Sequence, residues 1–97
     1  MNILSGAKAA AYPAHYVGVR PEHLEIVGSE GGAWTGIAVH SESLGADSFT
    51  YLDIGEEDLL TVRLPGTAQV AAGTTLSVSA KARHYHLFNA AGQVVAA

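Results

Sequence analysis

Apolar and polar residues alternate along most of this 97-residue chain, and this two-residue period constrains the fold more than any other feature. Successive side chains of a β-strand point to opposite faces, so the alternation is typical of strands with one buried face. Turn signals rich in Gly, Pro and Asp separate the alternating segments, which lie at residues 35–40, 48–54, 59–64 and 75–80. No window has a convincing helical period. The pattern therefore predicts an all-β fold, a small antiparallel barrel or a sandwich.

Residues 18–24 read Gly-Val-Arg-Pro-Glu-His-Leu and predict a strand that ends at a turn. Pro21 has no N–H group and a fixed φ, so a central strand cannot continue through it. We expect a strand over residues 16–20, a single helical turn near residues 21–24 and a second apolar run over residues 24–27. One further helical turn is possible over residues 68–72.

The two ends of the chain are less clearly patterned. Residues 7–14 are rich in Ala, which suits a helix, but Tyr12-Pro13 would end it, and a loose strand or connector fits equally well. Residues 85–88 and 93–95 flank an Asn-Ala-Ala-Gly turn and predict a terminal hairpin. We expect one domain over residues 1–97. Residues 1–16 would form a variable connector or first strand, and residues 17–97 the main β domain.

Composition excludes several classes of function. The net charge is −4, which argues against nucleic acid as a partner, and the absence of Cys excludes disulfides and thiolate metal sites. No apolar run is long enough to span a membrane, and the first fourteen residues do not resemble a signal peptide, so a cytoplasmic location is favoured. Charged residues make up only 14% of the chain. A surface covered by another chain would explain this, and so would chance composition rich in Ala.

The sequence lacks the motifs of common catalytic sites. No glycine pair opens a helix with a following Lys-Ser/Thr, so we expect no nucleotide hydrolysis and no bound cofactor. No Gly-x-Ser-x-Gly elbow is present, and the acidic residues 56–58 are typical of a solvated turn. His84 and His86, two residues apart, would share one strand face and could bind a metal with His40 or His23 as third ligand. A packing role for these histidines is favoured, because no carboxylate has ligand spacing.

Arg20 is the most interesting charge, since it lies beside Pro21 and Glu22 at a strand end. A guanidinium held there can form a bidentate pair with a carboxylate or dock on a partner. A local pair with Glu22 that shapes the turn is somewhat favoured over an interdomain contact.

Five segments in order resemble the C-terminal regulatory, TOBE-type domain of the ATPase subunits of sugar-import ABC transporters of the maltose or glycerol-3-phosphate type. In chain order they are Met-Asn-Ile-Leu (residues 1–4), Gly-Val-Arg-Pro-Glu-His (18–23), Val-His-Ser-Glu-Ser-Leu-Gly-Ala-Asp (39–47), Leu-Thr-Val-Arg-Leu-Pro-Gly (60–66) and His-Leu-Phe-Asn (86–89). Between Leu4 and Gly18 the family usually carries a longer piece with an extra strand pair. The shorter connection here predicts an incomplete barrel.

The resemblance implies a non-catalytic regulatory and dimerisation domain with an oligonucleotide-binding-like (OB-like) barrel. Its partners would be an ATPase domain, a second copy of the subunit and, indirectly, the membrane subunits, on the cytoplasmic face of the cell membrane. We expect a homodimer that uses residues 59–64 and 44–47. The candidate interdomain or partner contacts are Arg20, Glu22, His23, Leu44, Gly45, Asp47 and Arg63.

Two other functions compete with this interpretation. The first is a stand-alone module that binds an oxyanion such as molybdate, since related small barrels bind it between subunits. The chain has no obvious pair of anion loops rich in Ser, Thr and Lys. The second is a small metalloenzyme that uses His84 and His86.

Overall fold

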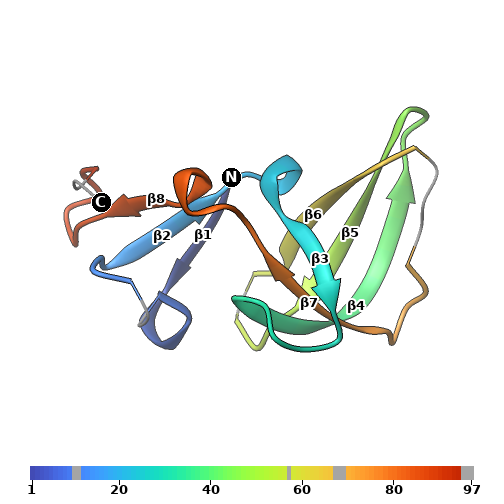
Figure 1. Ribbon diagram of the computed structural model, residues 1–97, viewed down its shortest axis with the longest axis horizontal. Coiled ribbons are helices and arrows are strands. Elements are labelled where there is room, and N and C mark those ends of the chain that lie inside the picture. The colour runs from blue at the N-terminus through green and yellow to red at the C-terminus, as the bar shows by residue number, and fades with distance from the viewer. Residues whose placement is uncertain (10–11, 57, 67–69, 95–97) are drawn as a thin grey trace.

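The computed structural model describes residues 1–9, 12–56, 58–66 and 70–94, which form two antiparallel sheets (Figure 1). The first sheet has the order β1-β2-β8 and consists of β1 (Asn2–Ser5), β2 (Tyr16–Val19) and β8 (His86–Phe88). The second has the order β3-β7-β4-β5-β6 and consists of β3 (Glu25–Gly28), β4 (Trp34–Ser43), β5 (Asp47–Asp53), β6 (Leu60–Pro65) and β7 (Thr75–Ser79). The predicted all-β fold is confirmed.

The strands lie where alternation predicts them, with one extension. The strand expected at residues 35–40 is β4, which continues to Ser43. Its register against β5 shifts between Ala38 and His40, as in a β-bulge. A bulge inserts one residue and lets a strand keep pairing while its side chains change phase. In the described residues the two sheets do not close into one barrel, so β1 and β6 remain at sheet edges.

Three single turns of 3-10 helix interrupt the strands: η1 (Gly6–Ala9), η2 (Pro21–His23) and η3 (Ala82–His84). η2 is the turn predicted from Pro21, which occupies the first helical position after an extended Arg20 with φ −76° and ψ 144°. η3 corrects a prediction. His84 ends this turn whereas His86 begins β8, so the two histidines do not share one strand face.

The chain crosses twice between the sheets, and both crossings contain a helical turn. η2, the cyan turn in Figure 1, leads from β2 to β3, and η3, the orange turn, leads from β7 back to β8. The rings of His23 in η2 and His84 in η3 stack with centroids 3.8 Å apart and planes 19° apart. The two crossings are therefore in direct contact.

A single apolar core joins the two sheets. Its buried members come from both of them and are Leu4, Ala9, Val17, Val19, Leu24, Trp34, Ala38, Leu52, Ile54, Leu60, Val62, Val78 and Leu87. The indole N–H of Trp34 donates to the carbonyl oxygen of Lys8 over 2.8 Å, and the rings of Trp34, Tyr12 and Tyr85 form a cluster in which each contacts the other two. Burial and a hydrogen bond with Tyr85 raise the pKa of Tyr12 to about 12.

The end of the chain folds back on β8. Phe88 forms an isolated antiparallel bridge with Val94, and the Asn89 carboxamide accepts hydrogen bonds from the backbone N–H groups of Ala91 and Gln93. The predicted terminal hairpin is therefore present as far as Val94; its last residue lies outside the described residues. Of the helical turn considered at 68–72, residues 68 and 69 lie outside the described residues, and the described residues 70–72 are not helical. No helix in the described parts of the chain has the length and apolar character needed to cross a membrane.

Candidate contact surface around Arg63

The centre of the candidate surface is an ion pair between neighbouring strands. Asp47 faces Pro65 and Phe49 faces Arg63 in the pairing of β5 with β6, so Asp47 and Arg63 are diagonal neighbours on one face. Nη2 of Arg63 donates to Oδ2 of Asp47 over 2.6 Å. This hydrogen bond raises the pKa of Arg63, and the charges of Asp47 and Glu22 add to the effect. Both side chains stay partly exposed, so the pair fixes a guanidinium at the surface.

The turn before β5 holds Asp47 in place. The backbone N–H of Leu44 donates to the carbonyl oxygen of Asp47 over 2.8 Å, and Gly45 has a φ of 88°, which favours glycine. The N–H of Gly66 at the end of β6 donates to the carbonyl oxygen of Ala46. Leu44 is 62% exposed at the tip of this turn. The turn that leads to Asp47 therefore carries an exposed apolar side chain.

η2 packs against β6 and brings Glu22 to the same place. A hydrogen bond with its own backbone lowers the pKa of Glu22, and the positive charges of His23, Arg20 and Arg63 lower it further. No ion pair joins Arg20 to Glu22 among the residues that the structure describes. Arg20 is exposed and acts on Glu22 only through its charge.

The structure therefore gathers six of the seven candidate residues in one region. We call this region the Arg63 corner; it consists of Arg20, Glu22, Leu44, Gly45, Asp47 and Arg63. The seventh, His23, follows Glu22, but its ring stacks on His84 at the junction of the two sheets. Its Nδ1 atom is buried and has no hydrogen-bond partner.

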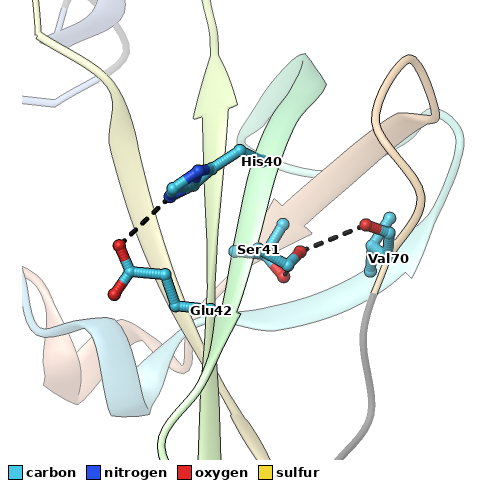
Figure 2. A network of polar contacts seen from close by, with 5 residues as sticks. His40, Ser41, Glu42 and Val70 are labelled. Carbon is cyan, nitrogen blue, oxygen red and sulfur yellow. Dashed lines mark hydrogen bonds and ion pairs between the residues drawn. The ribbon is translucent and has the colours of Figure 1, made fainter.

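The histidines considered as metal ligands do not come together as a set: His23 and His84 stack on each other, whereas His40 has other partners. Nε2 of His40 lies 3.2 Å from Oε1 of Glu42 (Figure 2). The centroid of the His40 ring lies 4.9 Å from that of the Tyr51 ring. Ser41, between His40 and Glu42 in sequence, points to the other side of β4 and donates to the carbonyl oxygen of Val70 (Figure 2). In the described ranges, no three His, Cys, Asp or Glu side chains are grouped closely enough to hold a metal ion.

Asn2 is a contact residue that sequence reasoning missed. Its carboxamide Nδ2 donates to the carbonyl oxygen of Thr61, and its Oδ1 accepts from the N–H of Thr61, over 2.8 and 2.9 Å. A side chain of β1 in the first sheet therefore bonds the backbone of β6, the edge strand of the second sheet. The only sequence signal for this residue is its place in the Met-Asn-Ile-Leu segment.

Two small antiparallel sheets over one core define an OB-like all-β domain. The TOBE domain family matches residues 17–88, and the chain belongs to this family. It is 42% identical over 74 residues to the sn-glycerol-3-phosphate import ATP-binding protein UgpC of Cupriavidus metallidurans, a match that covers 75% of this chain and 20% of that protein. It is 33% identical over 91 residues to UgpC 3 of Agrobacterium fabrum, covering 88% and 26%. The chain spans about a fifth of the length of the first of these relatives.

Proposed function

We propose that this chain is a non-catalytic regulatory and dimerisation domain in the ATP-binding subunit of a sugar ABC importer. The observation that carries the proposal is the TOBE family match over residues 17–88, together with relatives named as sn-glycerol-3-phosphate import ATP-binding proteins. The five motif segments and the absence of a phosphate loop in the sequence support the same assignment.

The proposed partners are the ATPase domain of the same subunit, a second copy of that subunit and, through them, the membrane subunits. The domain would work on the cytoplasmic side of the cell membrane. The Arg63 corner supports such contacts because it combines a fixed guanidinium, two carboxylates and the exposed Leu44. Arginine with a planar, oriented donor set is well suited to polar recognition at an interface.

A chimaeric transporter tests the proposal. This chain would replace the matching segment of the Cupriavidus metallidurans UgpC protein, in cells that lack their own copy. Glycerol-3-phosphate uptake should recover relative to a subunit from which the segment is deleted. Uptake no better than the deletion, with the chimaera folded and present at normal level, would overturn the proposed role.

Arg63→Ala in the chimaera tests whether the Arg63 corner acts as a contact surface rather than through an effect on folding. We expect lower uptake with unchanged amounts of protein, because the substitution removes a surface contact rather than core packing. Arg83→Ala is the matched control, since Arg83 is an exposed arginine in η3, outside the Arg63 corner. Equal uptake by both variants would exclude the corner as the contact surface.

Two measurements on the isolated chain complete the test. Calorimetric titration with Mg-ATP should give no saturable heat, since the sequence offers no phosphate loop. Light scattering should report a dimer. Saturable ATP binding would contradict the non-catalytic assignment, and a monomer at high concentration would contradict self-association.

A further inference from the structure

Strands β4, β5 and β6 have an outer face, which points away from the apolar core. Thr50 and Leu52 of β5 are fully buried. Side chains alternate along a strand, so Phe49 and Tyr51 lie on the outer face, and both are only half-buried. The ring of His40 on β4 lies close to the ring of Tyr51, which confirms that these two side chains share the outer face. Aromatic rings therefore occupy the middle of this face.

One row across the outer face carries an acid, an aromatic ring and a base. Phe49 on β5 is paired with Glu42 on β4 and with Arg63 on β6, so the three side chains are neighbours on one face. Neighbouring strands lie about 4.8 Å apart, which places the two charged residues on opposite sides of the ring. The side chains of Glu42 and Arg63 are 46% and 40% exposed. The row therefore presents opposite charges to a partner that covers it.

Both charged side chains keep hydrogen-bonding capacity for such a partner. A guanidinium has several N–H donors, and Arg63 uses Nη2 for its bond with Asp47. The carboxylate of Glu42 contacts Nε2 of His40 through Oε1 (Figure 2), and each oxygen of a carboxylate can accept more than one hydrogen bond. These local contacts hold the two charged side chains in place, which lowers the entropy lost when an interface forms.

The row is complementary to itself. When a second copy is turned over about an axis parallel to β5, the two sides of its outer face exchange places and the middle stays where it is. Glu42 of each copy then faces Arg63 of the other, and Phe49 faces Phe49. Tyr51, in the next row, also faces its own counterpart. Every contact of such an isologous interface occurs twice. A second copy therefore satisfies both charges and covers both aromatic rings.

We propose that this chain self-associates through the outer face of β4, β5 and β6, as a two-fold dimer in which Glu42 of each copy pairs with Arg63 of the other. The proposal rests on the dimerisation in the proposed function and deepens it, because it names the face, the axis and the paired charges. Sheets packed face to face lie about 10 Å apart and cross at about 30°, so the rows nearest the axis match best. The Arg63 corner lies at one end of this face, since Asp47 is the first residue of β5.

Charge reversal on the 97-residue chain tests the proposal, with the dissociation constant of the dimer measured by sedimentation equilibrium. Arg63→Glu and Glu42→Arg should each raise this constant at least about tenfold, because each variant places like charges face to face at two points. An equimolar mixture of the two variants should associate as tightly as the unchanged chain. In the mixed dimer every reversed charge faces its opposite across the axis.

Arg83→Glu and Glu25→Arg are the matched controls. Both residues are exposed and lie outside the outer face, in η3 and β3, so both variants should dimerise as the unchanged chain does. Urea midpoints show whether each variant is folded.

Three outcomes would overturn the proposal. If Arg63→Glu and Glu42→Arg dimerise as the unchanged chain does, the dimer uses another face, and the dimerisation in the proposed function still stands. If the mixture fails to associate, the two substitutions act within each copy and not across the axis. If the unchanged chain is a monomer at high concentration, self-association fails as well, whereas uptake by the chimaera still reports on the role in the transporter.

Discussion

The carboxamide of Asn2 holds both backbone hydrogen-bonding groups of Thr61, a residue that lies 59 positions further along the chain. This contact closes the open edge of β6 with a side chain from β1 and so ties the two sheets together outside their common core. A side-chain amide has the same donor and acceptor as a peptide group, which is why it can take the place of a neighbouring strand.

Asn2→Ala should therefore destabilise the fold. Losing two partly buried hydrogen bonds should lower the free energy of unfolding by about 1–3 kcal/mol, measured by urea denaturation. Amide exchange of Thr61 should also become faster. Asn89→Ala is the control, because Asn89 bonds only within its own turn and should leave the exchange of Thr61 unchanged. Unchanged stability together with unchanged exchange would show that the contact does not join the sheets.

Sequence patterns predicted the strands well, because alternation of apolar and polar residues is the direct consequence of a sheet with one buried face. The pattern at residues 35–40 could not predict that β4 reaches Ser43, since a bulge breaks the two-residue period at Val39. The 3-10 turn at His84 was also missed. A turn of three residues is too short for any periodicity to show, and a strand was expected there instead.

The sequence predicted which residues belong to the candidate surface, but not that they lie close together in the fold. Family-like motifs pointed to Glu22, Asp47 and Arg63 separately. Their proximity depends on the register between β5 and β6 and on the packing of η2 against β6. Neither is encoded in a local pattern. The Asn2–Thr61 contact could not be predicted from the sequence either. Asn2 bonds the backbone N–H and C=O of Thr61, groups that a residue of almost any type would provide.

Arg63→Ala should change binding far more than stability. The ion pair with Asp47 is exposed on one side, and exposed pairs contribute little to folding. The urea midpoint of the variant should match that of Arg83→Ala. Any self-association seen by light scattering should weaken only for Arg63→Ala. A clear loss of stability specific to Arg63 would instead assign the residue a structural role.

Tyr12 should make stability fall at alkaline pH. Its pKa is raised from 10.0 to about 12 in the folded chain, so the folded state favours the protonated phenol. The stabilisation is complete below pH 10 and is lost as the pH rises toward 12. Near-ultraviolet absorbance should show one tyrosine that ionises late, and Tyr12→Phe should remove this step. Persistence of the late step in the variant would assign it to another tyrosine.

The stacked histidines should make the junction of the sheets sensitive to mild acid. Burial lowers the pKa of His84 from 6.5, and the charges of His23, Arg83, Lys81 and His86 lower it further. The folded state thus favours neutral His84, whereas the unfolded chain binds a proton more readily. Stability is therefore complete above pH 6.5 and falls as the pH drops through 6.5 toward the lowered value.

Urea midpoints measured across this range for the unchanged chain and for His84→Gln test the effect. The variant should lose part of the pH dependence, because glutamine cannot take up a proton at this position. His15→Gln is the control, since His15 is exposed and lies at the opposite end of β2 from η2. It should follow the unchanged chain. If the urea midpoints of the unchanged chain and of His84→Gln vary with pH in parallel, protonation of His84 does not weaken the contact between the two crossings.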